Sequence, residues 1–168
     1  MKLLQALALG LLTLLPLHAA DEATETVSTT LDGARLEFHA RKIEARSRKT
    51  GDGYVVFEGQ LYRAIGNPPS RVMTSGTLRI GEQVIALDVS GLGDPWVDGK
   101  LEKRFILLTG DDFPSGPIHT LRVCFVKGGA EDYMVEWVIK DGKSLRKCIE
   151  DLGDTLPEWV KEAGGEKE

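Results

Sequence analysis

The chain has 168 residues, with 21 Lys and Arg against 26 Asp and Glu, which gives a net charge of −5 at pH 7. This length suits one domain with its own hydrophobic core. The negative charge disfavours nucleic acid as a partner. After the first fifteen residues no apolar run approaches the ~18 residues of a membrane-spanning helix, so we expect no stable span.

The first twenty residues have the pattern of a secretory signal peptide. Lys2 precedes an apolar run that ends at Pro16, and the small residues Ala19 and Ala20 follow. We expect residues 1–20 to be cleaved, which places the protein in the periplasm or outside the cell; an uncleaved anchor helix is the alternative. The first cysteine is Cys124, so the cleavage site lacks the cysteine of a lipoprotein.

The composition beyond this segment predicts a single β-rich domain. Residues 21–30 are polar and predicted to be a flexible mature N-terminus, 31–163 form the domain, and 164–168 a frayed tail. Asp-Gly pairs, which favour tight hairpin turns, alternate with runs of β-branched and aromatic residues. The predicted strands span residues 35–45, 54–64, 72–80, 83–89, 101–108, 120–127 and 133–140.

These strands predict a mainly β fold, an antiparallel sandwich or flattened barrel of about seven strands with one or two short C-terminal helices. In the last hairpin, pairing of Lys127 with Tyr133 would set Val123 opposite Trp137 on the core face. The other face carries Cys124 and Met134 and is too apolar to stay uncovered.

A helix at residues 144–152 is the expected cover. Leu145, Cys148, Ile149 and Leu152 recur at helical spacing. The two cysteines of an exported chain are expected to pair, and a Cys124–Cys148 disulfide would stabilise the fold by about 3 kcal/mol. A reactive thiol with a resolving partner is the alternative. A second helix is predicted from Thr155, with Glu158 completing a capping box.

The sequence offers no recognisable catalytic or metal-binding motif. Beyond the signal segment, His39 and His119 are the only histidines, and neither has a metal-ligand spacing. Ser90 lacks the flanking glycines of a nucleophile elbow. The acids 88, 94 and 98 match no calcium-loop spacing. We therefore expect a protein that is not an enzyme and holds neither a cofactor nor a metal ion.

Two rigid segments are the candidate binding surface. In one, Trp96 stands between Asp94 and Asp98; in the other, Phe113 follows Asp111 and Asp112. Together they predict aromatic anchors ringed by acids, suited to a basic partner. The alternatives are that Trp96 closes one end of the sandwich and that residues 110–117 are an ordinary connection.

A basic cluster suggests a different ligand, an anionic component of the cell envelope, although such charges also simply solubilise an edge strand. The cluster consists of Arg41, Lys42, Arg46, Arg48 and Lys49. Residues 40–44 and 55–61 resemble strand pairs of the periplasmic lipopolysaccharide-transport β jelly-roll proteins. This resemblance implies carriage of an envelope lipid.

The leading prediction is an exported, periplasmic, non-enzymatic binding protein that acts on another envelope or secreted protein as an inhibitor, immunity factor or adaptor. A carrier or sensor of an envelope lipid or glycan is the alternative. The sequence does not specify the oligomeric state.

Overall fold

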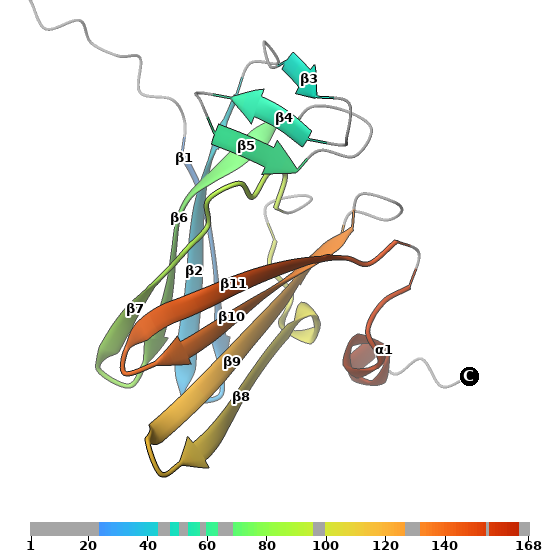
Figure 1. Ribbon diagram of the computed structural model, residues 1–168. Coiled ribbons are helices and arrows are strands. Elements are labelled where there is room, and N and C mark those ends of the chain that lie inside the picture. Colours follow the sequence, from blue (N-terminus) through green and yellow to red (C-terminus); the bar gives the residue numbers. More distant parts are fainter. Residues whose placement is uncertain are drawn as a thin grey trace, which may run out of the picture.

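The fold is a sandwich of two four-stranded antiparallel sheets, with a small three-stranded sheet beside them in the computed structural model (Figure 1). The structure describes residues 24–43, 48–50, 54–57, 60–63, 69–95, 100–126, 132–153 and 155–164. The prediction of a mainly β sandwich is confirmed. The barrel alternative is not, because each four-stranded sheet ends in edge strands rather than closing on itself.

The first sheet, called the N-sheet, has the strand order β1 (Thr24–Leu31), β2 (Ala34–Lys42), β6 (Arg71–Ile80), β7 (Gln83–Leu87). The second, the C-sheet, has the order β11 (Lys143–Asp151), β10 (Tyr133–Lys140), β9 (Gly116–Phe125), β8 (Ile106–Phe113). The small sheet contains β3 (Arg48–Thr50), β4 (Tyr54–Phe57) and β5 (Gln60–Arg63). A 3₁₀ turn η1 (Lys103–Phe105) precedes β8, and helix α1 (Glu158–Gly164) ends the described chain.

Tight turns join the strands where the sequence predicts them. Asp141 and Gly142 have φ values of 51° and 72°, which is the geometry of a two-residue hairpin turn between β10 and β11. Gly33 and Gly81 have φ values of 73° and 56° in the β1–β2 and β6–β7 turns. These positive φ values explain why glycine stands there.

The core lies between the facing sheets. Phe38 from the N-sheet packs against Phe125 and Trp137 from the C-sheet. The distance between the two ring centroids is 5.9 Å in each pair. All three side chains are at most 1% exposed. The Trp137 indole N–H donates a 2.8 Å hydrogen bond to the carbonyl of Asp88, so its polar atom is satisfied.

Each of the seven predicted strand regions contains strand, but three further strands, β1, β3 and β11, were not predicted. The expectation of a flexible N-terminus is wrong for residues 24–30, which pair with β2 over the whole of β1. Threonine and valine favour extended backbone, and Val27 places its side chain in the core at 4% exposure.

The predicted helix at residues 144–152 is also wrong, because these residues form β11 and pair with β10. A register shift opposite Val138 and Ile139 leaves Leu145 between Ser144 and Arg146 as an additional residue. Such a bulge breaks the two-residue alternation of a strand. The spacing of the apolar residues in this segment fits a helix in the sequence, but the pairing with β10 makes it a strand.

The predicted disulfide is absent, and both cysteines are free thiols. Cys124 lies on β9 opposite Met134, and Cys148 lies on β11 opposite Glu136. Strand β10 stands between them, which separates their backbones by about 10 Å across the sheet alone. A disulfide requires Cα atoms within about 7 Å.

Strands β9 and β10 have the predicted inward and outward faces, but they pair in a register that differs by two residues from the predicted one. Tyr133 pairs with Phe125, Val135 with Val123, and Trp137 with Leu121. An even shift leaves each side chain on its face, which is why the inward-facing set was predicted correctly.

Candidate functional site

The strongest candidate site is a groove of about 550 Å³ on the outer face of the C-sheet. One side is formed by residues of β9, β10 and β11, and the other by the chain that leads into α1 and by Trp159 of α1. Its lining residues are Arg122, Met134, Glu136, Glu150, Asp151, Leu152, Thr155, Leu156, Pro157 and Trp159.

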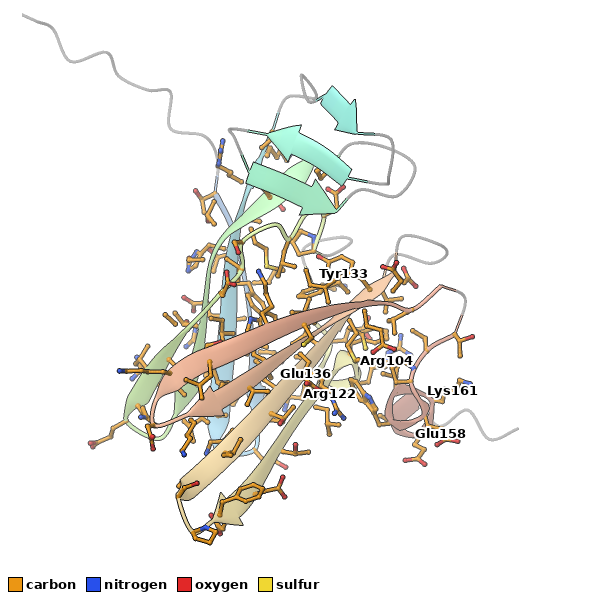
Figure 2. The ribbon with its side chains drawn as sticks, viewed as in Figure 1. Arg104, Arg122, Tyr133, Glu136, Glu158 and Lys161 are labelled. Atoms are coloured by element: carbon orange, nitrogen blue, oxygen red, sulfur yellow. The ribbon has the colours of Figure 1, made fainter. Side chains whose placement is uncertain are left out.

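An ion pair and a methionine form the floor. The Arg122 Nε donates a 2.8 Å hydrogen bond to Glu136 Oε2 across neighbouring strands. Figure 2 shows both residues on the C-sheet, on the side where α1 lies. Because side chains alternate along a strand, Met134 points outward with them, while Val135 and Trp137 point into the core.

The wall is the segment between β11 and α1, and backbone hydrogen bonds hold it. Leu152 N–H donates to the Asp132 carbonyl at 3.1 Å, and Thr155 N–H donates to the Leu152 carbonyl at 3.1 Å. The α1 helix begins at Glu158, later than the predicted start at Thr155. Pro157 supplies the carbonyl that accepts its first bond, from Val160 at 3.0 Å.

Helix α1 has one buried side chain, and its C-terminal end lies near Arg104. Val160 is 2% exposed. At the other end, a Cβ added to Gly164 would lie 3.6 Å from the Arg104 guanidinium, and Figure 2 shows Arg104 beside α1. The wall is therefore part of the folded domain.

The groove has an acidic balance on a partly apolar surface. Its lining includes Glu136, Glu150 and Asp151 against Arg122, so three negative charges face one positive charge and the excess is two. Met134 and Trp159 are among its apolar lining residues. Such a surface favours a ligand that combines positive charge with apolar groups.

Cys124 belongs to the same outer face and is 2% exposed. Burial, together with the nearby charges of Asp132 and Glu150, raises the pKa of its thiol to about 12. Since the thiolate is the reactive form, Cys124 is chemically inert at neutral pH.

Asp94, a predicted binding residue, instead caps the backbone of a neighbouring segment. Its carboxylate accepts hydrogen bonds from the backbone N–H groups of Ser70 and Arg71 at 2.9 and 3.0 Å, and from the Ser70 hydroxyl at 2.7 Å. Trp96 and Asp98, predicted beside it, lie outside the described residues.

The structure does not bring Asp94 and Phe113 together. Tyr133 OH donates to the Gly93 carbonyl at 3.0 Å, which places the Asp94 segment at the end of the C-sheet where Tyr133 pairs with Phe125. Asp111, Asp112 and Phe113 form the end of the β8–β9 hairpin, where Phe113 pairs with Gly116 and is 50% exposed. Nine residues of β9 separate the two ends, about 30 Å.

Ser90 takes part in a polar cluster that joins the sheets. Lys147 Nζ lies 2.9 Å from Ser90 Oγ and 3.1 Å from Asp88 Oδ2, while the Ser90 hydroxyl donates to Asp88 Oδ1 at 2.6 Å. Burial acts to raise the pKa of Asp88, but hydrogen bonds from Ser90 and the Lys147 ammonium outweigh it, so the pKa lies below its ordinary value. The cluster thus joins the chain that follows β7 to strand β11.

The histidines occupy structural positions. His39 Nδ1 lies 2.8 Å from Thr26 Oγ1 and its Nε2 lies 3.1 Å from Glu37 Oε1. The His119 ring packs over Gly110, where an added Cβ would come within 2.8 Å of it. Within the described ranges no group of three His, Cys, Asp or Glu side chains could hold a metal ion.

The basic cluster is divided among several elements. Arg41 and Lys42 end β2, and Lys42 Nζ lies 3.8 Å from Glu25 Oε1. Arg48 and Lys49 belong to β3. Arg46 lies outside the described residues, so the predicted anion site is described only in part.

Comparison with known proteins finds no matching family model, no matching curated protein and no matching solved structure. In the part of the chain that the structure describes, no helix has the length and apolarity to cross a membrane.

Proposed function

We propose that this protein is a non-enzymatic binding protein, and that its groove holds a basic segment of a partner protein. The observation that carries the proposal is the groove itself, with an excess of two acids over an apolar surface. An inhibitor, immunity factor or adaptor of the envelope would use such a site.

The chemistry of the groove favours a segment in which Lys or Arg alternates with apolar residues. The methylene stem of a Lys or Arg side chain can lie along Leu156 and Trp159 while its charged end reaches Glu150 or Asp151. Glu136 already has a cationic partner in Arg122. The two acids of β11 line the groove and are exposed to solvent, and we assign recognition of the partner to them.

Carriage of a lipid inside the sandwich has less support. The space between the sheets is occupied by side chains such as Phe38, Phe125 and Trp137, each at most 1% exposed. Interiors packed in this way do not admit an acyl chain without rearrangement.

The test is binding of a fluorescently labelled peptide of alternating Lys and Leu, measured by anisotropy. The double substitution Glu150→Lys with Asp151→Lys reverses the acidic rim and should weaken binding at least ~10-fold, about 1.4 kcal/mol. The matched control is Asp111→Lys with Asp112→Lys, which makes the same charge change at the far end of the C-sheet.

Unchanged affinity in the control together with a loss in the groove variant supports the proposal. An equal loss in both variants would show attraction to the overall negative charge and would overturn the groove as the site, as would failure of the wild-type protein to bind the peptide. Thermal unfolding of both variants shows whether each remains folded.

A further inference from the structure

Two arginines stand directly opposite each other on the outer face of the N-sheet. Arg35 on β2 pairs with Arg79 on β6 in the antiparallel register. Their neighbours Leu36 and Leu78 are fully buried, so the alternation of side chains along a strand turns both arginines outward. Side chains in such a pair have Cβ atoms about 4.5–5.5 Å apart, and like charges there destabilise a sheet.

The C-sheet contains the same arrangement with opposite charges. Arg122 on β9 faces Glu136 on β10, and the two side chains form an ion pair at 2.8 Å. In the N-sheet the corresponding pair has an arginine on both strands. Its two positive charges are therefore not compensated within the pair.

Within the described residues, Glu37 is the acid that contacts this pair, and it contacts Arg35 alone. Arg35 Nη2 donates a 3.0 Å hydrogen bond to Glu37 Oε2, and Glu37 Oε1 lies 3.1 Å from His39 Nε2. Arg79 has neither an ion pair nor a hydrogen bond in the described part of the chain, and its other cross-strand neighbour is the apolar Val84. Since a guanidinium stays protonated in proteins, Arg79 is a cation without a partner.

A hollow of about 230 Å³, here called the N-sheet pocket, lies over the arginine pair. Thr77, which is half-buried opposite Glu37, adds a hydroxyl group to the lining. A water molecule occupies about 30 Å³ of the liquid, so the pocket has room for a small anion together with several waters. The complete lining is Arg35, Glu37, Thr77, Arg79 and Val84.

We infer that the N-sheet pocket binds the phosphate group of a phosphate monoester between the guanidinium groups of Arg35 and Arg79. One arginine can occupy both oxygens of a carboxylate, whereas a phosphate monoester has three acceptor oxygens and a charge of about −1.5 to −2 at pH 7, which suits two arginines. This inference is independent of the groove, which belongs to the C-sheet.

Glu37 lowers the affinity of this site, because its carboxylate repels an anion and competes for Arg35. When Arg35 turns to the phosphate, the Glu37 carboxylate keeps its contact with His39. Removing the charge of Glu37 should therefore strengthen phosphate binding, which is an effect that a merely structural role of these residues would not produce.

The experiment is an NMR titration of the purified protein with glycerol 3-phosphate, in which the amide resonances around the N-sheet pocket should shift. Arg79→Gln should weaken binding at least ~10-fold, and Glu37→Gln should strengthen it about 3-fold. The matched control is Arg104→Gln, which removes the same charge from an arginine already paired with Glu102 and should bind like the wild type.

The inference is overturned if glycerol 3-phosphate shifts none of these amides at concentrations up to about 10 mM. It is also overturned if glycerate, which carries a carboxylate in place of the phosphate, binds equally well, or if Arg104→Gln loses as much affinity as Arg79→Gln. Thermal unfolding shows that each variant is folded.

A second measurement distinguishes the two sources of such a phosphate group. Phosphatidylcholine vesicles with and without phosphatidic acid, which carries glycerol 3-phosphate as its headgroup, are sedimented with the protein. Sedimentation that requires phosphatidic acid and is lost in Arg79→Gln assigns the site to a lipid surface. Binding of glycerol 3-phosphate without sedimentation assigns it to a soluble phosphate monoester.

Discussion

The N-sheet and the C-sheet share one core but have different outer faces. The outer face of the N-sheet is polar, with Thr26, Ser28, Glu37 and His39 on neighbouring strands, and His39 bonds to both Thr26 and Glu37. The outer face of the C-sheet carries Cys124 and Met134 beside the Arg122–Glu136 ion pair.

This difference in polarity explains the position of the groove. A polar face is stable in water, whereas covering an apolar face with another segment lowers the free energy of the protein. The chain between Leu152 and α1 lies beside this face, and the groove is bordered by residues of both. The lesson is that the outward-facing residues of a sheet determine whether it acquires a third layer.

The largest effect is expected in the core that both sheets share. Trp137→Ala should lower the free energy of unfolding by about 3–5 kcal/mol, because it leaves a cavity and removes the hydrogen bond to the Asp88 carbonyl. Phe113→Ala, at a half-exposed position on the β8–β9 hairpin, should cost less than about 1 kcal/mol. Urea denaturation measures both; equal losses would mean that the hairpin end is part of the core.

A pair of valine substitutions compares the two outer faces directly. Val160→Ala in α1 should destabilise by about 2 kcal/mol, since Val160 is 2% exposed. Val84→Ala, at 52% exposure on the N-sheet, should change stability by less than about 0.5 kcal/mol. If both substitutions cost the same, α1 does not act as a cover for the C-sheet.

The same variants change thiol accessibility. In the native protein a thiol reagent at neutral pH should modify Cys148, which is exposed, and leave Cys124 unmodified, because Cys124 is buried and its pKa is about 12. Val160→Ala should accelerate modification of Cys124, and Val84→Ala should not. Mass spectrometry counts the modified thiols, and a native protein without any reactive thiol would contradict the free state of Cys148.

The strands were predicted from local sequence patterns, and the wrong predictions arose from the same patterns. Asp141-Gly142 requires a turn whatever surrounds it, so the β10–β11 turn could be located from two residues. Leu145 and Ile149 are four positions apart, a spacing that fits one face of a helix and one face of a strand equally, so single-sequence periodicity cannot distinguish the two. Strand β1 was missed because its outward side chains are hydroxyls and only Val27 is fully buried.

The groove could not be located from the sequence because it depends on strand register. Arg122 and Glu136 are fourteen positions apart and meet only when Tyr133 pairs with Phe125. The predicted register, two residues away, sets Arg122 opposite Val138 instead. The sequence did indicate that the Cys124 face needs a cover, but not that the cover lies beyond β11.

The smallest expected effect concerns the polar cluster that ties the two sheets together. The pKa of Asp88 in the folded protein lies below its ordinary value, so the contribution of Asp88 to stability is present above the pKa of the unfolded chain and is lost as the pH falls through the lower, folded pKa. Asp88→Asn should therefore be less stable than the wild type at about pH 6, and the difference should shrink as the pH falls through the acid range.

Its magnitude should stay under about 1 kcal/mol, because the Asp88 side chain is 55% exposed and solvent screens the ion pair. Lys147→Met removes the partner cation, whose side chain is only 12% exposed. If the two residues act as one pair, Asp88→Asn should have a much smaller pH-dependent effect on stability in the Lys147→Met background than in the wild type. The effect that remains would come from the Ser90 hydrogen bonds. A difference that is the same in both backgrounds would show that Ser90 alone lowers the Asp88 pKa, and that the sheets are joined by their apolar core without help from this ion pair.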